Sequence, residues 1–315
     1  MFDATAVGRD VLRTVYKLHR LNLLGDIVVR QQVLKSLLGS IVVLTVCCSA
    51  LYAQDATTAP FYPLDCASNA DGDLFVVDRN LPGVWKITDG KAEVFFQGPK
   101  QFRQPLNAPR CIAIDEAGRV FVGDSAARNV FLIAEGQEPH PICSERIGIP
   151  MSIAVDSDGQ VIVADLELHR ILRLPRFEGA VVAPEVLAEI RAPRALTVDA
   201  EGDVWVVSGT AKAIRKVKPS GDIEVIVEQS SLKYPAGIAV LDGDVVVSDS
   251  YGKSVSKVGA DGTVTGLAAG DSLVYPVHLS ANADGVLIAD SRGGAIRQIK
   301  ADGTVTTLFE GNKGE

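Results

Sequence analysis

The sequence is poor in cysteine and in basic residues and lacks several catalytic motifs, and each shortage argues against a class of protein. Five cysteines in 315 residues are too few for a disulfide-framework protein. Basic residues are outnumbered, 31 Lys and Arg against 39 Asp and Glu, so the net charge of −8 argues against a nucleic-acid partner, which needs a basic surface. The sequence contains no Gly-x-Ser-x-Gly, His-Glu-x-x-His, Cys-x-x-Cys or phosphate-binding glycine loop. The 47% apolar content nevertheless excludes intrinsic disorder, so a folded domain is expected.

Charge is also missing from one stretch near the N-terminus. Residues 36–54 are uncharged and follow Arg30 and Lys35. A basic flank, an apolar core and a small residue at Ala53 are typical of a secretory signal cleaved before Gln54. The alternative is an uncleaved membrane anchor, because the stretch just reaches the roughly 18 residues that a spanning helix needs. We expect an exported protein, periplasmic or extracellular, whose only membrane contact is an uncleaved segment. The predicted organisation is 1–53 as extension and signal peptide or anchor, 54–62 as linker and 63–315 as the folded domain.

An internal repeat of 41 to 46 residues fills the rest of the chain. In each block a proline opens an apolar run, a glycine and a second β-rich run follow, and two further runs complete the block. Turn sequences such as Asp89-Gly90 and Asp261-Gly262 separate the last two runs. Such a block predicts a four-stranded antiparallel meander, and six of them arranged radially cover one another's faces. The sequence therefore predicts an all-β, six-bladed β-propeller. Its blocks open at Pro63, Pro109, Pro150, Pro193, Pro235 and Pro276.

Two details of this propeller are also predicted. Because the first and last blocks each contain all four runs, we expect the ring to close without a terminal strand inserted into another blade. The second block is expected to have a longer, proline-rich fourth strand at 137–143, and the third block an insertion at 175–184.

The blocks resemble the NHL repeat, Pro-x-Gly-Ile-Ala-Val-Asp followed by Gly-x-hydrophobic-aromatic-Val-Ala-Asp-Ser. Block 2 reads PRCIAIDEAGRVFVGDSAARNV, block 3 PMSIAVDSDGQVIVADLELHRI and block 5 PAGIAVLDGDVVVSDSYGKSV. The resemblance covers residues 63–311. It implies a propeller similar to those of the gluconolactonases and senescence-marker lactonases, virginiamycin B lyase and the peptidyl-hydroxyglycine amidating lyase. Those proteins are enzymes, whereas many NHL propellers only bind, so the fold does not decide the function.

A ligand is expected on one particular face. In propellers the connection into each first strand and the loop after each second strand usually share the customary ligand face. Residues one or two positions after the prolines therefore point toward it. A mouth with arginines on an acidic body suits an anionic small molecule or an acidic partner. The candidate residues on this face are Asp65, Arg110, Arg194, His278 and His169.

Charged residues recur at two further positions of the repeat. An aspartate ends the second run in every block but the fourth, which has Ser208. These aspartates either form a carboxylate ring for a cation such as Ca²⁺ or accept backbone hydrogen bonds in their own loops, and their repetition favours the structural role. Basic residues in the following loops either form a basic face or pair with the aspartates. The aspartates are Asp78, Asp124, Asp165, Asp249 and Asp290, and the basic residues are Arg79, Arg128, Arg170, Lys212, Lys253 and Arg292.

Asp65 and His278 occupy equivalent positions in the first and last blocks, which become neighbours when the ring closes. Such a pair can bind a metal, transfer a proton or make a purely structural contact. The resemblance to the amidating lyase implies three metal-binding histidines, and only His278 matches. The resemblance to the lactonases implies a Glu, an Asn and an Asp, and only Asp65 matches. No cofactor is therefore expected, with a divalent cation on this pair as the alternative.

Three cysteines remain after cleavage, Cys66, Cys111 and Cys143, and we expect buried thiols rather than a Cys66–Cys111 disulfide. Taken together, these features favour an exported NHL-type propeller that binds a small molecule or a protein. The alternative is a metal-dependent lactonase or lyase. Mostly small residues stand at the other inner-strand positions, which favours binding.

Overall fold

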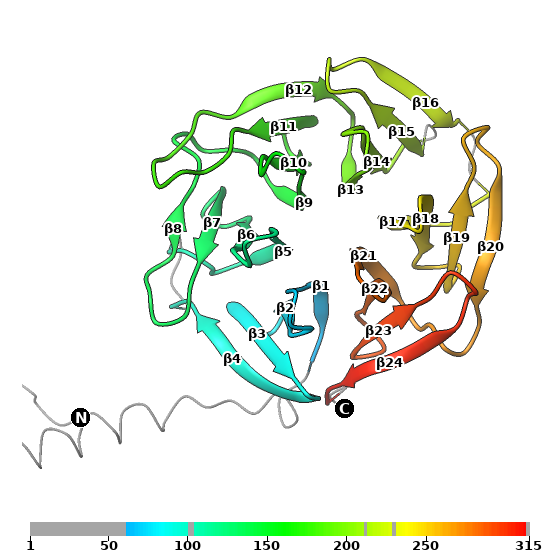
Figure 1. The fold of residues 1–315 in the computed structure, drawn as a ribbon, viewed down its shortest axis with the longest axis horizontal. Helices are drawn as coiled ribbons and strands as arrows, with labels where there is room; N and C mark the ends of the chain where they lie inside the picture. Colours follow the sequence, from blue (N-terminus) through cyan, green and yellow to red (C-terminus); the bar gives the residue numbers. More distant parts are fainter. Residues whose placement is uncertain (1–60, 100–103, 211–212, 229–230, 313–315) are drawn as a thin grey trace, which may run out of the picture. The chain divides into compact units, whose positions relative to one another are not determined.

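The computed structural model of the protein describes residues 61–99, 104–210, 213–228 and 231–312. The predicted signal segment or anchor, and nearly all of the predicted linker, lie outside them. Within the described residues, six antiparallel sheets each contain four consecutive strands, and the sheets stand around a central axis (Figure 1). The predicted six-bladed propeller is therefore confirmed. In this part of the chain no helix is long and apolar enough to cross a membrane.

The blades follow chain order, and each runs from an inner first strand to an outer fourth strand (Figure 1). Blade 1 contains β1 (Pro63–Ser68), β2 (Leu74–Asp78), β3 (Gly83–Thr88) and β4 (Lys91–Gln97). Blade 2 contains β5 (Pro109–Ile114), β6 (Val120–Asp124), β7 (Asn129–Ile133) and β8 (His140–Pro141). Blade 3 contains β9 (Pro150–Val155), β10 (Val161–Asp165), β11 (Arg170–Leu174) and β12 (Glu185–Glu189). Blade 4 contains β13 (Pro193–Val198), β14 (Val204–Ser208), β15 (Ile214–Val217) and β16 (Ile223–Val227). Blade 5 contains β17 (Pro235–Leu241), β18 (Asp244–Asp249), β19 (Ser254–Val258) and β20 (Val264–Ala269). Blade 6 contains β21 (Pro276–Asn282), β22 (Gly285–Asp290), β23 (Ala295–Ile299) and β24 (Val305–Glu310).

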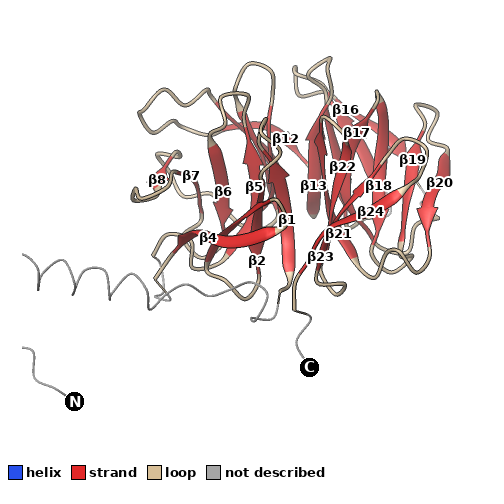
Figure 2. Ribbon diagram, turned by 60° about the horizontal axis from the view of Figure 1, so that its bottom comes forward, coloured by secondary structure: helices blue, strands red, loops and turns tan. Residues whose placement is uncertain are grey.

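The core lies between neighbouring blades rather than at one centre. Strands such as β2, β6 and β10 are buried at every position, because both faces of a second strand pack against adjacent sheets. This two-sided burial explains their continuous apolar runs. Fourth strands such as β20 have no fully buried position, because they form the outer edge of the ring (Figure 2).

The strand register places the predicted face. The opening proline of each blade pairs with the last residue of its second strand, as in Pro63 with Asp78 and Pro276 with Asp290. The starts of all inner strands therefore lie beside the ends of all second strands, on one face that we call the ligand face. The turns on the other face have the expected geometry, since Asp89 and Gly90 both have positive φ, 49° and 72°.

The ring closes as predicted, by contact between complete blades. β1 packs beside β21 and β22, and the Phe61 N–H donates a 2.7 Å hydrogen bond to the Asn312 carbonyl. Phe61 also meets Phe309 edge to face, with ring centroids 5.2 Å apart. The Ser291 hydroxyl donates to the Pro63 carbonyl across the same seam. Backbone and side-chain contacts thus join the two ends of the propeller.

The fourth strand of blade 2 differs from the prediction. Instead of a long strand at 137–143, β8 has only two residues, because Pro139 and Pro141 have no N–H to donate to a ladder. The insertion in blade 3 completes this edge. The Val182 N–H donates to the Ile142 carbonyl, and the Ser144 N–H donates to the Val182 carbonyl, both at 2.8 Å.

Candidate functional site

A cavity of about 410 Å³ opens on the ligand face, and we call it the central cavity. The residue immediately after every opening proline lines it, which places the cavity where all six inner strands begin. Its walls are largely apolar, with two arginines, two tyrosines and one histidine. An apolar hollow with a few converging polar groups is typical of a small-molecule site. The six residues that follow the prolines are Leu64, Arg110, Met151, Arg194, Ala236 and Val277.

A second hollow adjoins the first on the same face. This side cavity has a volume of about 470 Å³ and shares Leu64, Arg110 and Val277 with the central cavity. Arg110 therefore stands between two hollows. Tyr62 and Arg79 line the side cavity, and the Arg79 guanidinium lies 5.5 Å from the centroid of the Tyr62 ring.

Arg194 is held in a fixed position on the wall of the central cavity. Its guanidinium carbon lies 4.0 Å from the centroid of the Tyr234 ring, and its Nη1 donates a 3.4 Å hydrogen bond to the Pro235 carbonyl. On the other side lies Gly209, where a Cβ atom would be only 2.9 Å from Nη2 of Arg194. The guanidinium is thus sandwiched between a ring and a glycine, with most of its N–H groups available to an anion.

A cluster of three tyrosines beside Arg194 was not predicted from the sequence. Tyr251 packs edge-on against Tyr234 and Tyr275, with ring centroids 5.0 and 5.7 Å apart. Arg292 lies over Tyr275, 4.2 Å from its centroid. Burial raises the pKa of Tyr275, and its hydrogen bond with Tyr251 raises it further, so the phenol stays neutral at physiological pH. A sequence signal was present, since tyrosine precedes the opening proline at Tyr62, Tyr234 and Tyr275.

The repeated aspartates hold the loops of this face, as the structural interpretation predicted. Asp249 accepts backbone N–H bonds from Lys233, Tyr234 and Gly252 at 2.6 to 2.9 Å. Asp290 likewise accepts from the Tyr275 N–H at 2.6 Å. The aspartates therefore position the tyrosines that precede the prolines. Burial raises the pKa of Asp78, which accepts from the Tyr62 and Asn80 N–H groups.

The basic residues of the loops and those that follow the opening prolines differ in their partners. Arg128 pairs with Glu167 at 2.7 Å, and Arg170 pairs with Asp165 at 3.1 Å. Arg110 and Arg194, in contrast, have no carboxylate within ion-pair distance among the described residues. Lys212 lies outside the described residues. The two arginines of the central cavity are therefore not neutralised by the chain around them.

His278, Asp65 and Ser152 meet at the base of the central cavity. Nδ1 of His278 lies 2.6 Å from Oδ1 of Asp65, although its N–H points off the line of a hydrogen bond. Nε2 lies 3.2 Å from the Ser152 hydroxyl, which also accepts a bond from the Leu196 N–H. Asp65 and Ser152 are fully buried, and His278 lines the cavity with 7% of its surface exposed. The histidine ring is thus hydrogen-bonded at Nε2, while Nδ1 stands close to the Asp65 carboxylate.

Asp65 and His278 do not fit a resident metal ion. Both Asp65 oxygens already accept backbone bonds, Oδ1 from the Cys66 N–H at 2.7 Å and Oδ2 from the Ile112 N–H at 2.9 Å. No third His, Cys, Asp or Glu among the described residues completes a metal-binding group with them. A divalent cation needs several free oxygen or nitrogen ligands, and this pair supplies too few.

The structure brings four of the five candidates together and leaves one apart. Arg110, Arg194 and His278 line the central cavity, and Asp65 lies directly beneath His278. His169 is exposed and does not line this cavity. Its Nδ1 accepts a 3.2 Å hydrogen bond from the Ala192 N–H, which gives it a role in the loop.

The three remaining cysteines are free and buried, as expected. Burial raises the pKa of the Cys66 and Cys111 thiols well above its usual value, and raises that of Cys143 to about 11. All three are therefore protonated and unreactive at neutral pH.

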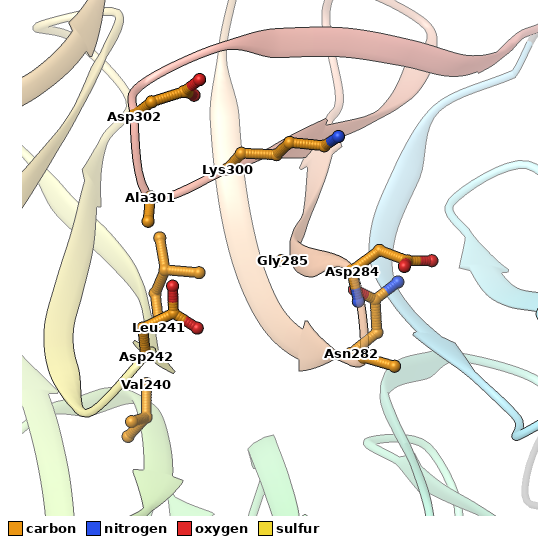
Figure 3. Close-up of a pocket in the computed structure, with 10 residues that line it drawn as sticks. Val240, Leu241, Asp242, Asn282, Asp284, Gly285, Lys300, Ala301 and Asp302 are labelled. Carbon is orange, nitrogen blue, oxygen red and sulfur yellow. The ribbon is translucent and has the colours of Figure 1, made fainter.

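A hollow of about 440 Å³ on the opposite face has a different character (Figure 3). It lies between turns of blades 5 and 6 and is lined by Asp242, Asn282, Asp284, Lys300 and Asp302. Asn282 is already engaged, since its Oδ1 accepts from Gln298 Nε2 at 3.1 Å. The residues that line this opposite-face cavity include no aromatic side chain and no arginine.

No family model and no curated protein matches the chain, so the NHL assignment stays a prediction. Solved structures do match. A catalytically inactive histidine-to-alanine variant of virginiamycin B lyase from Staphylococcus aureus, solved with quinupristin, has a TM-score of 0.61 at 15% identity, over 82% of this chain and 92% of that chain. A nidogen/laminin complex gives 0.61 at 18% identity, over 73% and 90%. A streptogramin B lyase gives 0.61 at 14% identity, over 84% and 88%. At these identities the likeness shows the fold alone, which enzymes and binding proteins share.

Proposed function

We propose that this chain is an exported, NHL-type binding propeller whose central cavity takes a small anionic molecule with an apolar body. The observation that supports this most is the pair of arginines without carboxylate partners in an otherwise apolar cavity. Arg110 comes from the inner strand of blade 2 and Arg194 from that of blade 4, and both line one hollow. An anion placed between them gains charge-assisted hydrogen bonds, and Leu64, Met151 and Val277 cover its apolar part.

The volume sets the size of this ligand. A cavity of about 410 Å³ has the space of roughly a dozen water molecules, which suits a molecule of one or two rings. The net charge of the whole chain is −8, so a positive mouth on an acidic body directs small anions to this one place.

Calorimetric titration with decahydro-2-naphthoate, an apolar carboxylate without an aromatic ring, tests the proposal. The probe is expected to bind the wild-type protein, and Arg194→Gln is expected to weaken it roughly 5- to 10-fold, because one charged hydrogen-bond donor is lost at a partly exposed site. Lys300→Gln is the matched control, since it removes the same charge from the opposite-face cavity and leaves the affinity unchanged. Equal affinity in the wild type and in Arg194→Gln contradicts the proposal.

A second candidate function is acid–base catalysis in the same cavity, as in a lactonase or lyase. His278 lines the cavity between Asp65 and Ser152, and the fold resembles a lyase whose histidine-to-alanine variant is inactive. Ser152 is fully buried, so it orients the ring and does not attack a substrate. His278 works as a base only when Nε2 exchanges its long 3.2 Å contact with Ser152 for a substrate proton. Because Nε2 already contacts Ser152 and no second group positioned to act on a substrate lines the cavity beside His278 among the described residues, binding is the function better supported.

Ring opening of dihydrocoumarin, followed by absorbance, tests this second candidate. Catalysis by His278 predicts a rate above the buffer background that His278→Ala removes and that Arg79→Gln, in the side cavity, retains. If the wild type and His278→Ala hydrolyse the lactone equally fast, the catalytic candidate is wrong, and the anion site is unaffected.

A further inference from the structure

Binding of an anion alone does not explain why a cluster of three tyrosines lies at the central cavity. Tyr234 and Tyr275 line the central cavity, and Tyr251 fixes both rings from outside by edge-to-face contacts. Tyr251 is 55% exposed, the highest value among the exposed large apolar and aromatic side chains. Large aromatic rings held in place beside a cavity, with no structural need to be exposed, indicate a surface that recognises a ligand.

The backbone beneath these rings is as fixed as the rings themselves. The Tyr234 and Tyr275 N–H groups donate to Asp249 and Asp290, and each tyrosine precedes the proline that starts an inner strand. Two arginines cover one face of each ring, Arg194 on Tyr234 and Arg292 on Tyr275. The positions of the rings are therefore set before a ligand arrives, which lowers the entropic cost of stacking.

The geometry points to an aromatic carboxylate as the class of ligand. We infer that the carboxylate lies against Arg194 and Arg110, and that a planar aromatic ring packs against Tyr275 within the central cavity. This inference rests on the proposed anion site and adds the aromatic character of the ligand. An edge of Arg194 and the ring of Tyr275 line the same hollow, so one rigid molecule reaches both. Met151 near the start of blade 3, across the ring from blade 6, provides apolar surface for the outer face of the ligand's ring.

Two probes of equal shape and charge test this inference: 2-naphthoate, which is aromatic, and decahydro-2-naphthoate, which is saturated. The wild-type protein is expected to bind 2-naphthoate roughly 2- to 10-fold more tightly, the gain of one aromatic contact beyond buried area. Tyr275→Leu is expected to bring the two affinities together, so that the ratio between the aromatic and the saturated probe falls to about one. Tyr62→Leu is the control, because Tyr62 also precedes an opening proline and lies under an arginine, but it lines the side cavity.

The possible failures are distinguishable. Equal affinity of the wild type for both probes, both lost in Arg194→Gln, overturns the aromatic inference and leaves the anion site standing. Affinities that Arg194→Gln does not change overturn the proposed function itself. If Tyr275→Leu does not fold, nuclear Overhauser contacts in the wild type decide instead. Contacts between naphthoate ring protons and the Tyr275 ring support the inference, and contacts to other residues alone overturn it.

Discussion

The groups around an arginine in this protein determine whether it stabilises the fold or is available to bind a ligand. Arg170 and Arg297 each donate to the aspartate that ends their blade's second strand, Asp165 and Asp290. Their positive charges are therefore paired with carboxylates within the fold. Arg194 has a glycine and a tyrosine ring as neighbours instead. Its charge is held in place without being neutralised, and this is the condition for binding an anion.

Gly209 provides a direct test of how Arg194 is held. A Cβ at this position would lie 2.9 to 3.0 Å from three guanidinium atoms, so Gly209→Ala displaces Arg194 from the Tyr234 ring. We expect the affinity for decahydro-2-naphthoate to fall by about 1 kcal/mol, because the displaced Arg194 side chain must be immobilised again when the anion binds, with little change in melting temperature. Calorimetric titration and thermal unfolding measure the two quantities.

The matched control for this substitution is Gly266→Ala. Gly266 lies in β20, and a Cβ there meets no atom within 4 Å. The same chemical change is expected to leave both affinity and melting temperature unaltered. Loss of affinity in both variants, or in neither, contradicts the role assigned to Gly209.

The part of the site on the inner strands could be predicted from position in the repeat. The part in the connecting loops could not, because it depends on where each loop side chain points. Arg110, Arg194 and His278 were predicted because they stand one or two residues after an opening proline, where the inner strands begin. The tyrosines one position earlier lie in connecting loops, and the repeat pattern does not state where a loop side chain points. His169 shows the same limit, since its loop directs it toward the Ala192 N–H instead of the cavity.

At the level of strands, a lysine–aspartate cluster joins the turn before β14 to β15. Asp203 accepts bonds from Lys216 and Lys218 at 2.6 and 2.7 Å. Burial raises the pKa of Asp203, but the two lysines lower it by more, so the pKa lies below its ordinary value. A carboxyl whose pKa is lower in the folded state stabilises the fold above its unfolded pKa, and this stabilisation is lost as the pH falls through the folded value.

The pH dependence of unfolding tests this cluster. Asp203→Asn is expected to lower the free energy of unfolding by about 1 kcal/mol at pH 7, and the difference from wild type is expected to shrink below about pH 4. Urea titrations at pH 7, 5 and 3 measure it. Asp244→Asn is the control, because the Asp244–Lys257 pair is exposed and single, with little effect expected at any pH. A difference between Asp203→Asn and wild type that is independent of pH contradicts the assignment.

Strand order and strand ends were predictable for most blades, because the alternation of apolar runs and glycine turns repeats. Blade 2 was not, because its edge combines two distant pieces of chain. The prolines around β8 stop the ladder, and Val182 of blade 3 provides the missing partner. A contact between residues 142 and 182 cannot be predicted from the local sequence around either residue.

At the scale of the whole molecule, the chemistry of the central cavity depends on which residue each blade places at the same position of the repeat. The second residue after each proline is aspartate, cysteine, serine, alanine, glycine and histidine in chain order. The fold requires only that these residues fit the narrow centre. Gly237 shows the constraint, since a Cβ there would lie 2.6 Å from the Leu279 nitrogen. Six similar blades therefore build the frame, and the dissimilar residues at its axis place Asp65, Ser152 and His278 together.

The seam between blades 1 and 6 determines whether the ring behaves as one unit. Phe61 and Phe309 are 3% and 5% exposed and belong to one apolar cluster with Val76 and Leu287. We expect Phe61→Ala to lower the free energy of unfolding by about 3 kcal/mol, because it leaves a cavity at the closure. Phe95→Ala, which removes a partly buried ring from the cluster between blades 1 and 2, is the comparison.

Hydrogen exchange separates the consequences of these two substitutions. A closure that stabilises both ends of the ring predicts faster exchange in β1 and in β21 to β23 for Phe61→Ala, because these strands meet across the seam. For Phe95→Ala, faster exchange is expected only in blades 1 and 2. Exchange in Phe61→Ala that rises in blade 1 alone would mean that the blades are stable without closure. The central cavity, which needs inner strands from all six blades, would then not depend on the seam.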